Sequence, residues 1–263
     1  MSPSLPAIRT RVGHADWGDN AFCGFSVATE LAGEETIAGL IAMAAAGRRL
    51  SPDERAVLDD VAVAMTVADA RIWPLKMTRL LSSYGSCLPA FAAAILCIED
   101  ASIGHWTSGE AAALLSQLRD EATELTVEAM RGPIEKRLKA GVRLIGFGVP
   151  FRPFDERVRT LKACLARSGR EQLPHWRALE AAAGAARELR GLDANIGLAV
   201  AATCLDLGFT PPQIAVLSIA LGMTDYLANA VEGAEQRLAI LRRLPDDRVE
   251  YVGKAERASP RMK

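Results

Sequence analysis

The chain has 263 residues, half of them hydrophobic, and a formal net charge of −1. This balance allows a large core and gives no indication of a nucleic-acid partner or of an anionic membrane surface. Aromatic residues make up only 5% of the chain while alanine is abundant, which favours closely packed helices over a β-sandwich. The longest apolar stretch, Cys87–Ile98, is too short to span a bilayer.

The start of the chain and its cysteines are those expected of a cytoplasmic protein. Residues 1–6 lack the charged and then apolar order of a signal peptide. The five cysteines are scattered, odd in number and mostly within apolar helical runs, which is typical of reduced core thiols. We therefore expect neither disulfides nor a metal site.

Strands are expected only in the N-terminal part, up to about residue 27. Residues 8–12 and 21–25 are predicted to form two short strands on either side of the polar turn 16–20. From Thr36 onward a 3.6-residue apolar period dominates. The sequence therefore predicts an all-α fold class.

Three helices have clear sequence signals. The segment SPDE at 51–54 is predicted to begin a helix, with a serine cap, an early proline and an acidic residue that completes a capping box. Residues 88–97 are apolar on every side and are expected to form a central buried helix. Ser108 is expected to cap a long helix over 110–130 that Gly132 and Pro133 stop. Further helices are expected at about 133–140, 155–167, 174–190, 194–207, 211–221 and 223–241.

One stretch between helical runs, 146–157, cannot be the interior of a helix. Gly146 and Gly148 flank Phe147, and prolines follow at positions 150 and 153. Both residue types disfavour a helix interior. The stretch is therefore predicted to be a rigid loop, and loops held on a rigid scaffold often carry functional residues. An ordinary turn between helices remains the alternative.

This loop resembles the Gly-Phe-Gly-His signature, with its following Asp-Pro-Arg, of the citrate synthase family, and more closely of the short members of the citryl-CoA lyase type. Further segments resemble other motifs of the family: ADA at 68–70, GHWTSGEA at 104–111, LDANIGLAVAA with LDLGF at 192–209, ANAVE at 228–232 and RVEYVG at 248–253. They follow one another in the family's order over about residues 8–258, which indicates the family's fold.

The resemblance implies a citrate synthase-like helical fold with a large domain at 1–140 plus 221–263 and a smaller inserted domain at 141–220. It also implies a homodimer whose active site is shared between the two subunits. The substrate would be a coenzyme A thioester, without a tightly bound cofactor, possibly together with a carboxylate-bearing second substrate. In the family, the loop that corresponds to Ile145, Gly146, Phe147 and Gly148 contacts the adenine end of coenzyme A.

The family's chemistry needs a histidine and an aspartate, which form or release the enolate of a thioester. By resemblance, His105 donates a hydrogen bond to the thioester oxygen. The alternative is a histidine that bonds only to backbone at a helix start. The family's aspartate falls on Gly197 in this chain, so Asp193 or Asp155 would have to replace it as the base.

The residues that hold the family's oxo acid are largely replaced. Arg157 corresponds to an arginine that grips a carboxylate, although it could instead belong to a helix-start ion pair. Arg248 corresponds to an arginine that reaches into the neighbouring subunit's site. Two histidines of the family are replaced by Ala70 and Val149, and an arginine is replaced by Gly222.

These losses indicate a changed substrate. A lost charge-assisted contact costs about 1.5–3 kcal/mol, and a lost catalytic base forfeits about 10²–10⁴-fold in rate. Ordinary citrate synthesis is therefore not expected. With Gly197 in the place of the aspartate, and with Trp106 and Phe151 nearby, the pocket is expected to suit a bulkier, less charged acyl group.

Three functions follow from this reading. The first is an enzyme that makes or cleaves a carbon–carbon bond next to the carbonyl of a coenzyme A thioester, through an enolate. The second is a hydrolase of a thioester or β-oxo thioester on the same fold. The third is a non-catalytic member that binds a partner or regulates a catalytic one. A carboxylate within reach of the acyl α-carbon would favour the first.

Overall fold

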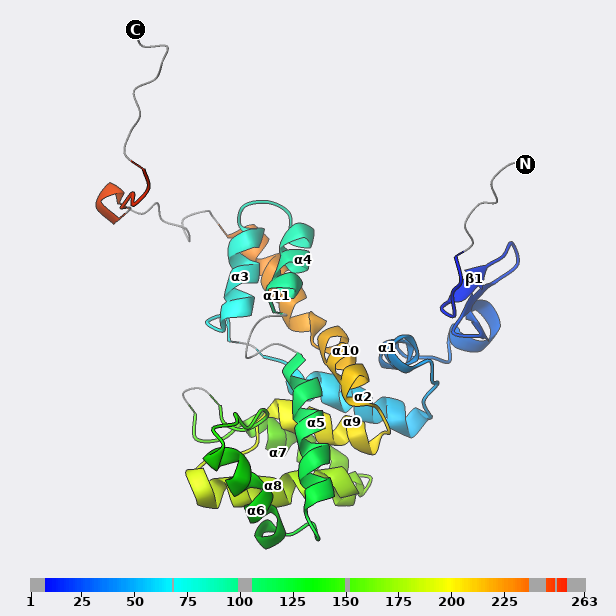
Figure 1. The fold of residues 1–263 in the computed structure, drawn as a ribbon. Coiled ribbons are helices and arrows are strands. Elements are labelled where there is room, and N and C mark those ends of the chain that lie inside the picture. The colour runs from blue at the N-terminus through cyan, green and yellow to red at the C-terminus, as the bar shows by residue number, and fades with distance from the viewer. Residues whose placement is uncertain are drawn as a thin grey trace, which may run out of the picture.

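The computed structural model describes residues 8–67, 69–98, 106–149, 152–236, 245–248 and 250–254, apart from four side chains. Within these ranges the chain is helical except for one small sheet near the N-terminus (Figure 1), so the predicted all-α class is confirmed. The α-helices are α1 (Ile37–Ala46), α2 (Pro52–Met65), α3 (Trp73–Ser82), α4 (Cys87–Ile98), α5 (Trp106–Glu121), α6 (Val127–Lys139), α7 (Glu156–Ala166), α8 (Pro174–Arg190), α9 (Ile196–Asp206), α10 (Pro211–Leu221) and α11 (Met223–Glu235).

The small sheet consists of three short antiparallel strands in the order β1–β2–β3. They are β1 (Gly13–Ala15), β2 (Asn20–Phe22) and β3 (Phe25–Ser26), with Gly13 opposite Phe22. The first strand was expected at 8–12, which is wrong. The turn between Asp16 and Asp19 sets the register, so pairing starts beside that turn at Ala15 and extends only to Gly13. Figure 1 shows this sheet at some distance from the helical body.

Helix starts follow the local chemistry of the sequence where a cap is present. Ser51 and Glu54 form the predicted capping box at the start of α2. The predicted helix over 110–130 is wrong, because the chain leaves the helix after Glu121 and starts α6 at a second cap, Thr126. Pro133 then lies inside α6 and does not stop it.

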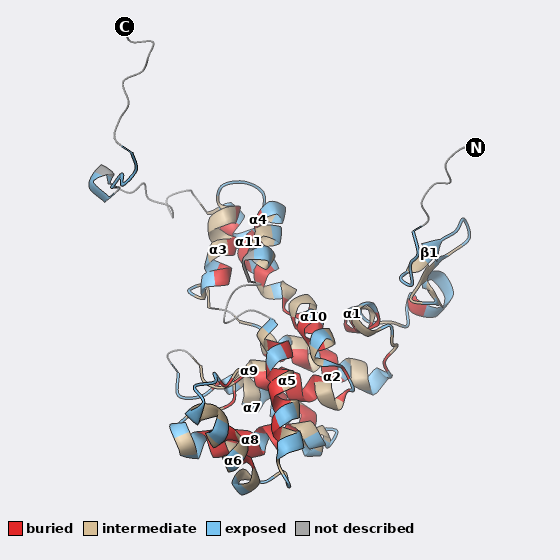
Figure 2. Cartoon of the chain, viewed as in Figure 1, coloured by how far each residue is buried: buried red, intermediate tan, exposed pale blue. Residues whose placement is uncertain are grey.

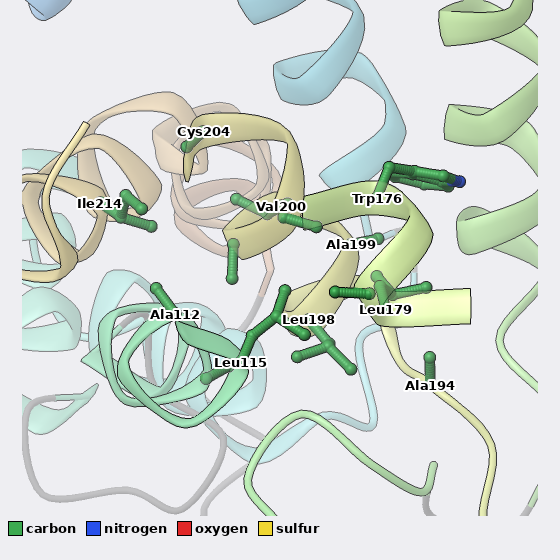
Figure 3. Close-up of a cluster of buried hydrophobic side chains, with 14 of the residues drawn as sticks. Ala112, Leu115, Trp176, Leu179, Ala194, Leu198, Ala199, Val200, Cys204 and Ile214 are labelled. Carbon is green, nitrogen blue, oxygen red and sulfur yellow. The ribbon is translucent and has the colours of Figure 1, made fainter. Parts of the chain in front are cut away.

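Most of the buried side chains belong to one large cluster formed by α1, α2 and α5 to α10. Figure 3 shows its centre, where Leu115 of α5 and Leu198 of α9 lie next to one another, with Ile214 of α10 on one side and Trp176 of α8 on the other. Burial at this scale is the main stabilising contribution in such a fold. The cluster takes residues from both sides of positions 140 and 220, so it does not itself mark the predicted domain division, which stays a prediction.

A second, smaller unit consists of α3, α4 and α11, which pack against one another away from the main cluster (Figure 1). Leu75 of α3 and Tyr226 of α11 are buried between them. The expectation that the apolar helix near 88–97 is central and buried is wrong for its ends. Leu88 and Leu96 of α4 are 70% and 75% exposed (the helix is largely pale in Figure 2).

Helices α10 and α11 follow one another and join the two units. Their combined run, Pro211–Glu235, has the length and hydropathy of a membrane-spanning helix. Half of the apolar window is nevertheless buried inside the protein, and the run is interrupted at Gly222. Length and hydropathy of this kind are also found in core helices of water-soluble folds.

Candidate functional site

The loop between α6 and α7 is fastened to the start of α9 by three hydrogen bonds. The Gly148 N–H donates to the Asp193 carbonyl at 2.7 Å, and the Asn195 N–H donates to the Gly146 carbonyl at 2.9 Å. The Asn195 side-chain amide donates to the Gly148 carbonyl at 3.0 Å. Gly146 and Gly148 have φ values of 91° and 80°, in the left-handed region that favours glycine. The described start of the loop is therefore held on α9, while the rigidity of the whole stretch 146–157 stays a prediction.

Gly146 also brings the loop against α5 and α9. A Cβ atom at Gly146 would lie 2.9 Å from the Cβ of Leu198 and 3.1 Å from the Cβ of Ala111. Both distances are shorter than ordinary carbon contacts. A glycine is thus required at this position by its conformation and by the close approach of the two helices. Ile145 and Phe147 on either side are partly buried against the main core.

Gly197, in the first turn of α9, faces the first turn of α5. Asn195 caps α9 by accepting from the N–H groups of Gly197 and Leu198. A Cβ atom at Gly197 would lie 3.9 Å from the Oγ of Ser108. His105 directly precedes α5, but it lies outside the described residues. The N-termini of α5 and α9 therefore lie side by side, next to the loop.

Asp155 links the loop region to two helices. It caps α7 by accepting from the Arg157 N–H, and its second oxygen accepts from the Ile196 N–H at 2.9 Å, at the start of α9. The Arg157 side chain reaches both carboxylate oxygens, with Nε and Nη2 each at 2.8 Å. Asp155 is 3% exposed. Its burial alone would raise its pKa, but Arg157 and the backbone N–H groups outweigh burial and lower the pKa.

The hydrogen bonds of Asp155 and Arg157 give both residues a structural role. Both oxygens of Asp155 accept hydrogen bonds, so the carboxylate holds Arg157 and the two helix starts together. The Nη1 group of Arg157 has no hydrogen-bond partner among the described residues. The helix-start ion pair considered from the sequence is therefore present, while the roles of Asp155 as a base and of Arg157 as a substrate ligand stay predictions.

Asp193, the other candidate base, lies in the loop before α9 and not on a helix turn. Its Oδ1 accepts from Arg187 Nη2 of α8 at 2.8 Å and from the Ala194 N–H at 2.9 Å. Its carbonyl holds the Gly148 N–H. The side chain is thus oriented toward α8, and its part in catalysis stays a prediction.

A third carboxylate, Asp225, was missed in the sequence. It lies in the first turn of α11, and its Oδ2 accepts from the Val67 N–H at 2.8 Å. Burial raises its pKa, while the Val67 hydrogen bond and the positive charge of Arg157 partly oppose that effect. Asp225 therefore lies within the electrostatic influence of Arg157. The only sequence signal was its position three residues after Gly222, where the family's arginine is lost.

The remaining predicted residues are spread around these elements. Val149 pairs with Arg152 across the loop by a single antiparallel bridge. Trp106 begins α5 and is 53% exposed. Ala70 lines a pocket beside α3. Arg248 is exposed in the short 3-10 helix Asp246–Arg248, which lies apart from the helical body in Figure 1. Phe151 lies outside the described residues.

A second histidine, His175, forms a structural link. Its Nδ1 lies 2.8 Å from Asp206 Oδ1, and its Nε2 lies 2.8 Å from Arg119 Nη1. Because arginine can only donate, Nε2 accepts and Nδ1–H donates to Asp206. His175 thereby connects α8 to α5 and α9. Among the described residues, no group of three or more His, Cys, Asp or Glu side chains could hold a metal ion.

Comparison of the whole chain with known proteins gives matches in structure only. No family model matches the sequence, and no curated protein matches it significantly. The structure of citryl-CoA lyase from Hydrogenobacter thermophilus is 19% identical, with a TM-score of 0.78, over 98% of this chain and 99% of that one.

Two further solved structures show the same architecture over part of their length. Citrate synthase from Thermoplasma acidophilum, solved with carboxymethyl coenzyme A and oxaloacetate, is 20% identical with a TM-score of 0.62, over 86% of this chain and 59% of that one. ATP citrate lyase from Methanosaeta concilii, solved with (3S)-citryl-CoA, is 14% identical with a TM-score of 0.76, over 96% of this chain and 43% of that one. The chain therefore has the helical fold shared by citryl-CoA lyase and the citrate synthases.

Proposed function

We propose that this protein binds a coenzyme A thioester and makes or cleaves a carbon–carbon bond next to the thioester carbonyl. The observation that carries the proposal is the loop Ile145–Gly148, whose two left-handed glycines fasten it to the start of α9 and against α5. The similarly folded citrate synthase and ATP citrate lyase were solved with coenzyme A derivatives. This loop is the part of the family pattern that the chain keeps intact.

The loop lies against α5, and this position is consistent with a reaction that passes through an enolate. In the cleavage direction a base takes the proton of a β-hydroxyl group, the carbon–carbon bond breaks, and its electron pair moves to the thioester oxygen. Donors at that oxygen lower the barrier most when they are fixed before the reaction. His105, directly before α5, is the proposed donor, and the N-terminus of α5 adds a favourable dipole for negative charge.

The charges around Arg157 support a substrate other than oxaloacetate or citrate. Asp155 binds this guanidinium through both oxygens, and Asp225 lies within its electrostatic influence. The carboxylate of Asp155 already balances the charge of Arg157, so this arginine brings no excess positive charge for a dicarboxylate. We therefore propose a less charged second substrate or acyl group at this site, in agreement with Val149 in the place of a histidine.

A non-catalytic thioester-binding protein is the second candidate, and the missing base favours it. Gly197 contributes no side chain opposite Ser108. Asp193 and Asp155 are both engaged by arginines within the described part of the chain. If the only carboxylates near the thioester remain in these pairs, binding could persist without turnover.

We further propose that the protein acts as a cytoplasmic homodimer. The exposed leucines of α4, Leu88 and Leu96, support a subunit interface on the α3–α4–α11 unit, since large apolar residues usually become covered. The short 3-10 helix Asp246–Arg248 lies apart from the helical body in Figure 1, which supports a contact with the second subunit. A molecular mass of one chain in solution at micromolar concentration would contradict the dimer.

The first experiment is a calorimetric titration with coenzyme A and with acyl-CoA esters from acetyl to branched and aromatic acyl groups. We expect binding that tightens as the acyl group becomes larger and less polar. Absence of binding by every ester would contradict the proposed function. It would leave the loop as a feature of the fold alone.

Catalysis is then tested by exchange of the α-protons of the best-binding ester in deuterated water. We expect exchange by the wild-type protein and none by His105→Ala with an unchanged circular dichroism spectrum. His175→Ala is the matched control, because His175 is bound by Asp206 and Arg119 and should affect stability only. Tight binding without exchange in the wild-type protein would favour the non-catalytic candidate.

A further inference from the structure

A pocket of about 200 Å³ opens beside the first turns of α3, outside the loop at Ile145–Gly148. Among the described residues, its lining consists of Ala70, Arg71, Lys76, Arg79 and Leu80. Three of these five are cationic and none is acidic. Lys76, Arg79 and Leu80 are spaced three and four residues apart, which places them on one face of α3.

Both arginines of the pocket bind carboxylates that do not line it, and they differ in exposure: the side chain of Arg79 is 16% exposed, whereas that of Arg71 is 90% exposed. Arg71 Nε and Nη2 bind the carboxylate of Asp69 at 2.8–3.2 Å. Arg79 binds Glu232 of α11 through Nη1 and Nη2, each at 2.7 Å, and Asn229 through Nη1 at 3.1 Å. Neither Asp69 nor Glu232 lines the pocket. The largely buried guanidinium of Arg79, held by Glu232 and Asn229, therefore loses little side-chain entropy when a ligand binds.

Unused donors remain on all three cations. Nη1 of Arg71 and Nε of Arg79 make no hydrogen bond to a described residue, and Lys76 makes no hydrogen bond or ion pair within the described part of the chain. Asp69 pairs with Arg71 and Glu232 pairs with Arg79. Lys76 therefore leaves one positive charge in excess. A concave site with such an excess concentrates negatively charged ligands.

Asp69, which binds Arg71 beside the pocket, is within the electrostatic influence of one residue of the loop before α7. The hydrogen bonds of Arg71 lower the pKa of Asp69 to about 2, and the positive charge of Arg152, in the loop before α7, adds to this effect. The small side chain of Ala70, which lines the pocket, does not fill it. An apolar wall is provided by Leu80.

We infer that this pocket binds the anionic end of a ligand, a carboxylate or a phosphate group carried on a less polar stem. Arg79 supplies an oriented N–H donor for the oxygens of such a group, Arg71 supplies a second, solvent-exposed guanidinium, and Lys76 supplies a further positive charge. The site uses none of the residues predicted from the family except Ala70. The anion pocket can therefore be tested independently of the thioester loop.

The test compares wild type, Lys76→Ala and Lys76→Glu for binding of citrate, malonate, inorganic pyrophosphate, coenzyme A and 3′-dephospho-coenzyme A. Binding is measured by calorimetry at low and at high salt. We expect Lys76→Ala to weaken at least one of these anions about 10-fold at low salt and Lys76→Glu to abolish its binding. Lys136→Ala is the matched control, because Lys136 is an exposed, unpaired lysine on α6, far from α3 in Figure 1.

The ligands identify which anion the pocket takes. Loss of citrate or malonate binding assigns the pocket to a carboxylate, whereas loss of coenzyme A binding with dephospho-coenzyme A unchanged assigns it to the nucleotide phosphate. Equal binding of every anion to wild type and both Lys76 variants, or no binding of any probe at low salt, would overturn the inference. Tight acyl-CoA binding, together with equal binding of every anion to wild type and both Lys76 variants, would overturn it while leaving the proposed function in place.

Discussion

The Arg157 guanidinium and the Asp155 carboxylate form a two-pronged ion pair, with both N–O distances at 2.8 Å. The same carboxylate accepts the Ile196 N–H at 2.9 Å. The pair thereby joins the start of α7 to the start of α9, directly beside the loop that holds Gly146 and Gly148. This buried ion pair therefore sets the geometry of the site. It affects a bound ligand only through that geometry.

We expect Asp155→Asn to destabilise the protein by about 3 kcal/mol at neutral pH, because it breaks a buried pair and leaves Arg157 without its counter-charge. The pKa of Asp155 is lowered below 3.8 in the folded state. Its contribution is therefore present above about pH 4 and is lost as the pH falls through the folded pKa. Urea unfolding at pH 7 and near pH 3 measures both effects. Glu156→Gln, which removes an exposed ion pair with Arg152, should change little.

Asp225→Asn should behave in the opposite way. Burial raises the pKa of Asp225 above its ordinary value, so the folded state binds a proton more readily than the unfolded state. The carboxyl group then favours folding at low pH, and this advantage is lost as the pH rises through the folded pKa. We expect the asparagine variant to be about 1 kcal/mol more stable than wild type at pH 7 and equal to it near pH 3. A variant that is less stable at pH 7 would show that the attraction to Arg157 outweighs burial.

Gly146 and Gly148 provide a matched pair of alanine variants. Both have left-handed φ values, so alanine costs about 1–2 kcal/mol at either position. At Gly148 the nearest atom to the new methyl group is 3.6 Å away, whereas at Gly146 three side-chain carbon atoms lie at 2.9–3.1 Å. Gly146→Ala should therefore cost about 1–3 kcal/mol more than Gly148→Ala. Thermal and urea unfolding of the two variants, followed by coenzyme A titration, checks the difference.

Restoring the missing carboxylate tests whether the rest of the site is competent. An aspartate at Gly197 would start 3.9 Å from Ser108 Oγ and 3.2 Å from the capping oxygen of Asn195, so it fits with a small shift. We expect Gly197→Asp to raise α-proton exchange of a bound acyl-CoA ester by about 10²–10⁴-fold. Gly197→Asn is the control of equal size without the base. Equal exchange by both variants would mean that the thioester carbon does not lie beside this position.

Local signals in the sequence predicted a large part of the fold. Ser51 with Glu54, and the prolines at the starts of α8 and α10, mark helix N-termini by their own chemistry. The break between α5 and α6 was missed because Thr126, its capping residue, lies inside an apolar run of helical period. One continuous helix over residues 110–130 matches the apolar periodicity of this segment as well as two separate helices do.

The site could be located from the sequence only in outline. The pattern around Gly146 predicted the loop, but it could not show that Asp155 reaches Ile196, because that contact joins residues 41 positions apart. Nothing local distinguishes Asp225 from an ordinary acidic residue in the first turn of a helix. Likewise, an apolar helix such as α4 has the same pattern whether its leucines meet a core or another subunit.

The contact between Asp155 and Ile196 has a consequence for cooperativity. It closes a loop that contains α7 and α8, so it can form only when both helices are in place and the entropy of closing the loop has been overcome. Opening at any one of these helix starts removes a buried partner from the others. Amide protons of α7, α8 and the first turn of α9 should therefore exchange with solvent as one unit, and the loop at Gly146 should exchange with them.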